Sequence, residues 1–300
     1  MGGSSTLSHT KPYELAQDYR NLLAKIFGET VVDSLVDFSR NGVSIKLKEP
    51  EKLNQFIKNY EKRSKNEGCK TCKNVFLTHE KAAKLKDFSK RKMDFPSWLD
   101  SIDFRNQHRK QIMLIGEDVS PDIKRYIGIA YALGRYPIKS NGEVKSRTEK
   151  KNKLWFRLHD IFGNLEPIKK NLYITDTSKC HAYKISQIWK NCSESYLHEE
   201  IELINPEIII FQGRTAFDKT SSILKKMSAK VLEDPSTSSY FTGTNFPKFG
   251  KICFPNGKEI TYLKIYHSST QNAGKHCAHK DGYKKLIEDK IQPLIDHTHA

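Results

Sequence analysis

The chain has 300 residues, of which 37% are hydrophobic and 29% are charged, and its lysines and arginines leave a net charge of +16. It contains no run of about 18 uncharged apolar residues, which excludes a membrane-spanning helix, and its first residues lack the apolar run of a signal peptide. We therefore expect a cytoplasmic protein with no membrane partner and no evident obligate protein partner. So basic a balance favours a polyanionic partner, most often nucleic acid, over a basic surface without a specific ligand.

Residues 1–66 predict an N-terminal helical segment. Apolar residues recur at helical spacing from Leu15 to Phe27 and again from Val31 to Phe38. Asn41-Gly42 then interrupts the pattern. A third helix is expected over 50–65, because Pro50 suits its first turn and basic residues suit its last. The pattern leaves open whether these helices form a separate cap or pack on the main domain.

Residues 67–300 predict one α/β domain. Short apolar runs predict four strands, at 111–118, 171–179, 206–214 and 261–269. Helical patterns lie between them, at 150–163, 195–205 and 215–227. Strands that alternate with helices indicate a central parallel four-stranded sheet flanked by helices. The polar stretches 138–153 and 233–252 are expected to be loops.

Polar residues follow three of the predicted strands, at the point where each strand ends. These segments are Gly116-Glu117-Asp118, Asp176-Thr177-Ser178 and His267-Ser268-Ser269. The carboxyl ends of parallel strands meet at one edge of a sheet, which is where such folds bind ligands. Each segment alone is a weak signal, but their order along the chain is a more specific one.

These segments resemble the motifs of the uracil-DNA glycosylase superfamily, and most closely those of its iron–sulfur members. The resemblance covers about 112–295, and the Cys69–Cys72 pair adds to it. Its most specific part is the block Tyr-Ile-Thr-Asp-Thr-Ser-Lys-Cys at 173–180, followed by Leu-Ile-Asn-Pro at 203–206. The chain departs from the family in lacking proline at Val119 and Ser268, and in having Asp176 where the family has the asparagine that reads uracil.

The resemblance implies a DNA glycosylase that flips a base out of DNA and hydrolyses its N-glycosidic bond. Asp118 matches the carboxylate that positions water and stabilises the cation-like sugar, with Glu117 as the second choice, and His267 matches the donor to the departing base. Asp118 could instead cap a following helix. The remaining substrate contacts would come from Gly116, Asp176, Tyr136 (or Tyr131) as a stacking platform, and Ser268 and Ser269 pressing into the DNA.

Asp176 changes the base that we expect to be read. An asparagine amide can both donate and accept, whereas a carboxylate only accepts. A carboxylate can accept from the exocyclic amine of cytosine but cannot donate to the O4 atom of uracil. We therefore expect a modified cytosine-type base, as in defence against phage DNA. The alternative is that Asp176 is protonated or turned away and that the protein is a uracil-DNA glycosylase of base-excision repair.

Four cysteines match the ligand set of the iron–sulfur members: Cys69, Cys72, Cys180 and Cys192. Four thiolates suit either a [4Fe–4S] cluster or Zn²⁺, and the resemblance favours the cluster. Two further functional alternatives stay open. A non-catalytic DNA-binding module could use the same scaffold, and the many lysines leave room for a lyase step through a Schiff base.

Overall fold

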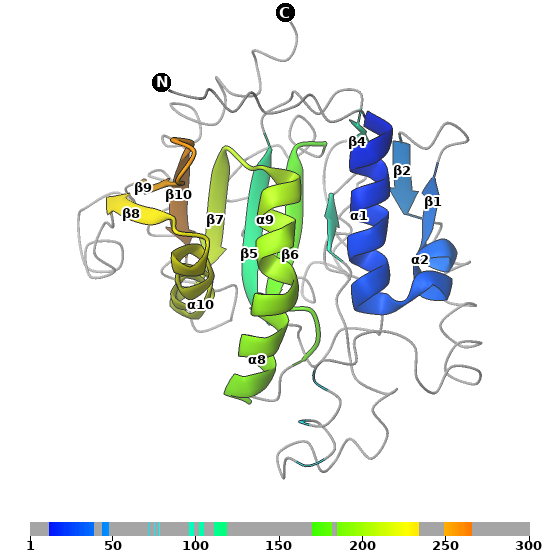
Figure 1. Ribbon diagram of the computed structural model, residues 1–300, viewed down its shortest axis with the longest axis horizontal. Helices are drawn as coiled ribbons and strands as arrows, with labels where there is room; N and C mark the ends of the chain where they lie inside the picture. Colours follow the sequence, from blue (N-terminus) through cyan, green and yellow to red (C-terminus); the bar gives the residue numbers. More distant parts are fainter. Residues whose placement is uncertain are drawn as a thin grey trace, which may run out of the picture.

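The fold is seen in a computed structural model (Figure 1). The structure describes residues 12–38, 44–47, 72, 75, 78, 96–98, 102–104, 111–118, 170–181, 185–233 and 249–265. Several predictions fall outside these residues. They are the helices expected at 50–65 and 150–163, and the functional residues Cys69, Tyr136, Tyr131, His267, Ser268 and Ser269.

A mixed sheet of seven strands forms the centre of the described part of the chain. Its strand order is β3-β6-β5-β7-β10-β9-β8. In that order the strands are Ser97–Trp98, Leu172–Ser178, Ile112–Asp118, Ile208–Gln212, Glu259–Ile265, Gly250–Cys253 and Lys230–Glu233. Neighbouring strands from β6 to β10 are parallel, whereas β3, β9 and β8 are each antiparallel to a neighbour.

The expected four-stranded parallel sheet is therefore too small. The strands that the apolar runs predicted lie side by side, but antiparallel strands extend the sheet at both edges. The loop expected at 233–252 is wrong at its two ends, because β8 ends at Glu233 and β9 begins at Gly250. The side chains of β8 are mostly exposed, so this edge strand carries little of the apolar signal from which a strand is predicted.

Helices cover one face of the sheet (Figure 1). The segment after β6 is one continuous helical stretch: α8 (Ser186–Cys192), a π-helical turn (Ser193–Leu197) and α9 (His198–Ile204). After β7 comes α10 (Arg214–Lys226). This alternation of parallel strands with helices confirms an α/β fold.

Side chains on alternate positions of the strands pack on the two faces of the sheet. Met113, Ile115 and Phe211 share a core with Leu197 and Ile201 of the helices. Ile112, Leu114 and Ile210 alternate with them and are equally buried. Burial on both faces explains why these strands have continuous apolar sequences rather than alternating ones.

The N-terminal segment is only partly helical. It contains α1 (Pro12–Phe27) and α2 (Glu29–Leu35), followed by β1 (Val36–Phe38), which pairs antiparallel with β2 (Ser44–Leu47). A third strand, β4 (Ile102–Asp103), pairs with β2. The expectation of helix up to Phe38 is therefore wrong. Asn-Gly between two runs of β-branched and apolar residues is a hairpin signal, and here it outweighs the helical spacing.

Helix α1 packs on the main sheet. Its buried residues belong to the same hydrophobic core as β5, β6 and α9. The hydroxyl of Tyr19 donates a hydrogen bond of 2.8 Å to the carbonyl of Pro96, and its ring meets that of Trp98 edge to face at 5.1 Å. The division of the chain at residue 66 stays a prediction. No described helix is long and apolar enough to cross a membrane.

Candidate functional site

The ends of three neighbouring parallel strands place Asp176, Gly116 and Gln212 in one row. Gly116 of β5 is the register partner of Asp176 of β6. On the other side of β5, Ile115 pairs with Phe211, so the next positions, Gly116 and Gln212, are also adjacent. All three residues lie on the face opposite α8–α10, and the polar pair is almost completely buried, with Asp176 and Gln212 each 6% exposed.

Gly116 makes room for the carboxylate of Asp176. A Cβ atom at Gly116 would lie 2.0 Å from Oδ1 of Asp176 and 3.5 Å from Oε1 of Gln212. No carbon and oxygen pack as closely as the first distance, so a glycine is required while the carboxylate keeps this position. Gly116 was predicted to contact substrate. That contact stays a prediction, but the glycine has a structural reason of its own.

Gln212 was missed by the sequence analysis. It directly follows the apolar run Ile-Ile-Ile-Phe of β7. Its place at the end of a predicted strand was the signal that could have identified it. Its register partner is Ile265, the last described residue of β10 and two residues before His267. Gln212 therefore lies on the β10 side of the row. His267, the predicted donor to the base, follows β10 two residues later.

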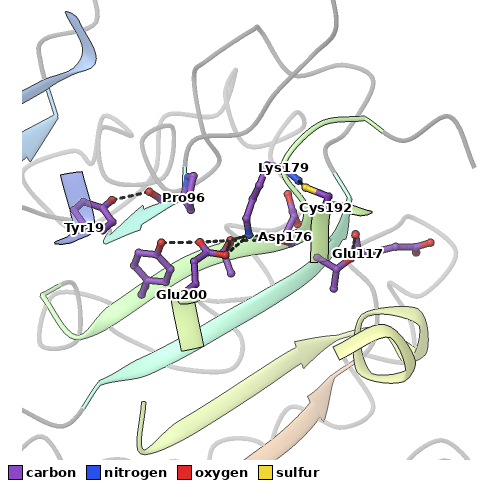
Figure 2. A network of polar contacts seen from close by, with 10 residues as sticks. Tyr19, Pro96, Glu117, Asp176, Lys179, Cys192 and Glu200 are labelled. Atoms are coloured by element: carbon purple, nitrogen blue, oxygen red, sulfur yellow. Dashed lines mark hydrogen bonds and ion pairs between the residues drawn. The ribbon is translucent and has the colours of Figure 1, made fainter. Parts of the chain in front are cut away.

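The two acids predicted after β5 differ in what the structure says of them. Asp118 is the last residue of β5 and the register partner of Ser178, while its side chain lies outside the described part. Glu117 is half-buried, and its position in the strand puts it on the opposite face from Gly116. Figure 2 shows its carboxylate pointing away from Asp176, and its carbonyl accepts a hydrogen bond from the hydroxyl of Thr177. The structure therefore does not bring Glu117 to the Asp176 row.

A buried polar network lies beneath the same end of β6, on the helix side (Figure 2). Lys179 and Glu200 form an ion pair whose side chains are 2% and 0% exposed. The carboxylate of Glu200 also accepts hydrogen bonds from the hydroxyls of Tyr173 (2.8 Å) and Thr175 (3.0 Å). The ammonium of Lys179 donates to the backbone carbonyl of Asp176 at 2.6 Å. Both charges are thus paired and hydrogen-bonded, as buried charges must be.

This network also perturbs the tyrosines around it. Burial raises the pKa of Tyr173 well above its usual value, and the nearby charge of Glu200 raises it further. Burial raises the pKa of Tyr19 for the same reason, again with a contribution from Glu200. Both phenols are therefore neutral donors in the folded protein. No local sequence pattern predicts this network, and the available signal was that Glu200 stands among the apolar residues on the buried side of α9.

Three of the four predicted metal-ligating cysteines are described, and all three are buried. Cys180 follows β6, and Cys192 ends α8 and accepts a hydrogen bond of 3.1 Å from the backbone N–H of Lys179. The thiol of Cys72 lies 3.8 Å from the carbonyl of Ile188, also in α8. Buried thiols and the N–H···S bond to Cys192 are of the kind found around thiolate-bound metals. Among the described residues, however, no three or more potential ligands converge on one point, so the three cysteines do not define a metal centre without further ligands.

The strand ends that carry Gly116, Asp176 and Gln212 all lie within a region that matches one known protein family. Residues 102–289 match the family model described as the uracil DNA glycosylase superfamily. The match spans more than half of the chain and includes β5, β6, β7 and β10. A comparison with curated protein sequences finds no relative of significant similarity.

Proposed function

Because the chain belongs to the uracil DNA glycosylase superfamily, we propose that it is a DNA glycosylase that hydrolyses the bond between a flipped base and its sugar. The family match over the strand ends is the observation that carries this proposal. The net charge of +16 supports it, since a basic protein attracts the phosphate backbone of DNA.

The proposed reaction needs an anionic group and a hydrogen-bond donor on opposite sides of the scissile bond. The sugar becomes cation-like as the base departs, so a carboxylate near it stabilises the transition state and can hold the attacking water. We assign this role to Asp118, which ends β5 two residues after Gly116. The donor to the departing base is assigned to His267. Glu117 suits the first role less well, because its strand position directs it to the other face of the sheet.

We further propose that the base is a modified cytosine. Asp176 lies in the row formed by the strand ends, where the missing side chain of Gly116 leaves room for its carboxylate. A carboxylate accepts a hydrogen bond from the exocyclic amine of cytosine, whereas it repels the carbonyl oxygen that uracil has at the same position. A modified cytosine as target fits a role in defence against phage DNA. Excision of uracil in DNA repair is the competing proposal.

The cysteines are proposed to bind a [4Fe–4S] cluster, with Zn²⁺ as the alternative. Burial of Cys72, Cys180 and Cys192 around α8 and the end of β6 supports this, and Cys69 would be the fourth ligand. When bound, the group would hold the segment after β6 in place. The chemistry at the base is assigned to the chain's own residues.

The test is to incubate the protein with oligonucleotides that contain uracil, cytosine, methylcytosine, hydroxymethylcytosine or glucosylated hydroxymethylcytosine, and to identify released bases by mass spectrometry. We expect release of a modified cytosine, and we expect Asp176→Asn to shift release towards uracil. Release of uracil alone from the wild-type protein would refute the cytosine assignment. DNA binding without release of any base would instead favour the non-catalytic module, and a product trapped by borohydride would reveal a lyase step.

A further inference from the structure

Gln212 lies across Gly116 from Asp176 in the row of strand ends, and the proposed reaction does not use its side chain. The two side chains flank Gly116 on the same face of the sheet, at the carboxyl ends of parallel strands. Both approach the space above Gly116, with Oδ1 of Asp176 at 2.0 Å and Oε1 of Gln212 at 3.5 Å from the position of a Cβ atom there. The absent side chain of the glycine thus lets a carboxylate and an amide converge.

A carboxylate alone cannot read the whole edge of a cytosine. That edge presents the exocyclic amine, which donates, next to the ring nitrogen N3, which accepts. A carboxylate satisfies the amine but leaves N3 facing a negative charge without a donor. A glutamine amide carries two N–H donors together with one acceptor oxygen.

We propose that Gln212 is a specificity-determining residue that supplies the donor which Asp176 lacks. In this arrangement Asp176 accepts a hydrogen bond from the exocyclic amine of the base. The amide of Gln212 turns about its last bond, so that its NH2 group replaces Oε1 in facing the base and donates to the ring N3 atom. The inference rests on the proposed function, in that it names how the same site selects an aminopyrimidine. Uracil has the opposite pattern at these two positions, with a carbonyl oxygen and a ring N–H, so the pair would reject it.

The burial of the row strengthens this selection. Asp176 and Gln212 are each 6% exposed, so little water competes for their hydrogen bonds. An unmatched donor or acceptor in such a place costs its full desolvation, which is why buried polar pairs discriminate more sharply than exposed ones. Gln212 is also the register partner of Ile265, so it stands beside the strand that leads to His267.

The experiment measures binding separately from cleavage. Oligonucleotides carry one sugar-fluorinated cytosine, hydroxymethylcytosine or uracil nucleotide, because fluorine on the sugar disfavours the cation-like state and prevents hydrolysis. The dissociation constants are measured for the wild-type protein, for Gln212→Met, which removes both hydrogen-bonding groups at similar size, and for Gln212→Glu, which keeps acceptors only. The matched control is Gln187→Met, since Gln187 is exposed on α8 and, within the described part of the chain, its side chain donates to Asn191 of the same helix.

We expect the wild-type protein to prefer one of the aminopyrimidines to uracil, and both Gln212 variants to lose about tenfold of that preference, as one hydrogen bond to a base is worth. Gln187→Met should keep it. A wild-type protein with no such preference, or Gln212 variants that retain it in full, would overturn the inference. Melting temperatures identify a variant that has merely unfolded, and in that case the other Gln212 variant tests the inference.

The glycosylase proposal is decided separately, by release of bases from unfluorinated DNA. Release of a base together with unchanged selectivity in both Gln212 variants would refute the role of Gln212 alone. Selective binding that depends on Gln212, without release of any base, would refute glycosylase activity and leave the reading role standing.

Discussion

Lys179 joins the end of β6 to helix α9, because its buried ammonium donates to the backbone carbonyl of Asp176 at 2.6 Å while it pairs with Glu200. The backbone N–H of the same lysine donates to the thiol of Cys192. One residue therefore contacts both the segment proposed to read the base and a cysteine proposed to bind metal. The ammonium of Lys179 thus contacts the backbone of Asp176 from the helix side of the sheet.

Replacing Lys179 by methionine should destabilise the protein strongly. The change leaves Glu200 buried without its cation, and breaking a buried ion pair in this way costs about 3–5 kcal/mol. The free energy of unfolding, measured by urea titration, checks this. Lys225→Met is the matched control, since Lys225 is exposed near the end of α10 and its loss should cost less than about 0.5 kcal/mol.

The double variant Lys179→Met with Glu200→Met tests whether the cost of each single change comes from leaving the other charge buried and unpaired. When both charges are removed, no unpaired charge stays buried, so the double variant should be less destabilised than the two single variants together. Additive losses would mean that the two side chains stabilise the fold independently, which would contradict the pairing described here.

Gly116→Ala should destabilise the fold through Asp176 in particular. The new methyl group would overlap the carboxylate, whose oxygen lies 2.0 Å from its position, and overpacking of this kind costs about 1–3 kcal/mol. Asp176→Ala removes the obstacle. Unfolding measurements on the two single variants and the double variant should therefore show that alanine at 116 is much less costly when Asp176 is absent. An equal cost in both backgrounds would show that the carboxylate does not occupy this space.

Much of this arrangement follows from the sequence, and the rest has identifiable causes. The strands β5, β6 and β7 each begin with an apolar run that is buried on both faces, so their positions were predicted closely. The expectation failed at Val36–Phe38, where helical spacing continues into a strand, and at β8, whose side chains are largely exposed. Gln212 was missed because its place beside Gly116 depends on the register between two strands. The Lys179–Glu200 pair was missed because it joins segments that are distant in sequence, and a local pattern predicts neither.

The stability of the protein at high pH should depend on Tyr173. Its pKa in the folded state is raised above the ordinary value of about 10. The folded protein therefore holds this proton more tightly than the unfolded chain, and the contribution to stability, complete below pH 10, is lost as the pH rises above it. The free energy of unfolding should fall less steeply above pH 10 in Tyr173→Phe than in the wild-type protein. Parallel slopes would contradict a buried, neutral phenol.

The metal proposal predicts that Cys180→Ser and Cys192→Ser lose bound iron and acid-labile sulfide relative to the anaerobically purified wild-type protein. Serine is a poor replacement for a thiolate ligand of a cluster. Cys253→Ser is the control, because Cys253 lies in β9, is partly exposed and belongs to no predicted ligand pair. Zinc in a colourless wild-type protein would support the alternative metal, and neither metal in any preparation would contradict the site.

The most direct test of the account is the rate of base release under single turnover, compared between the wild-type protein, Asp118→Asn and His267→Ala. Each change should slow release by roughly 10²–10⁴-fold, because each removes a group proposed to act in the transition state. DNA affinity should remain, because in a protein with a net charge of +16 the phosphate contacts are expected from basic residues elsewhere. Release at the wild-type rate by either variant, or no release by the wild-type protein from any of the modified or unmodified DNAs, would contradict it.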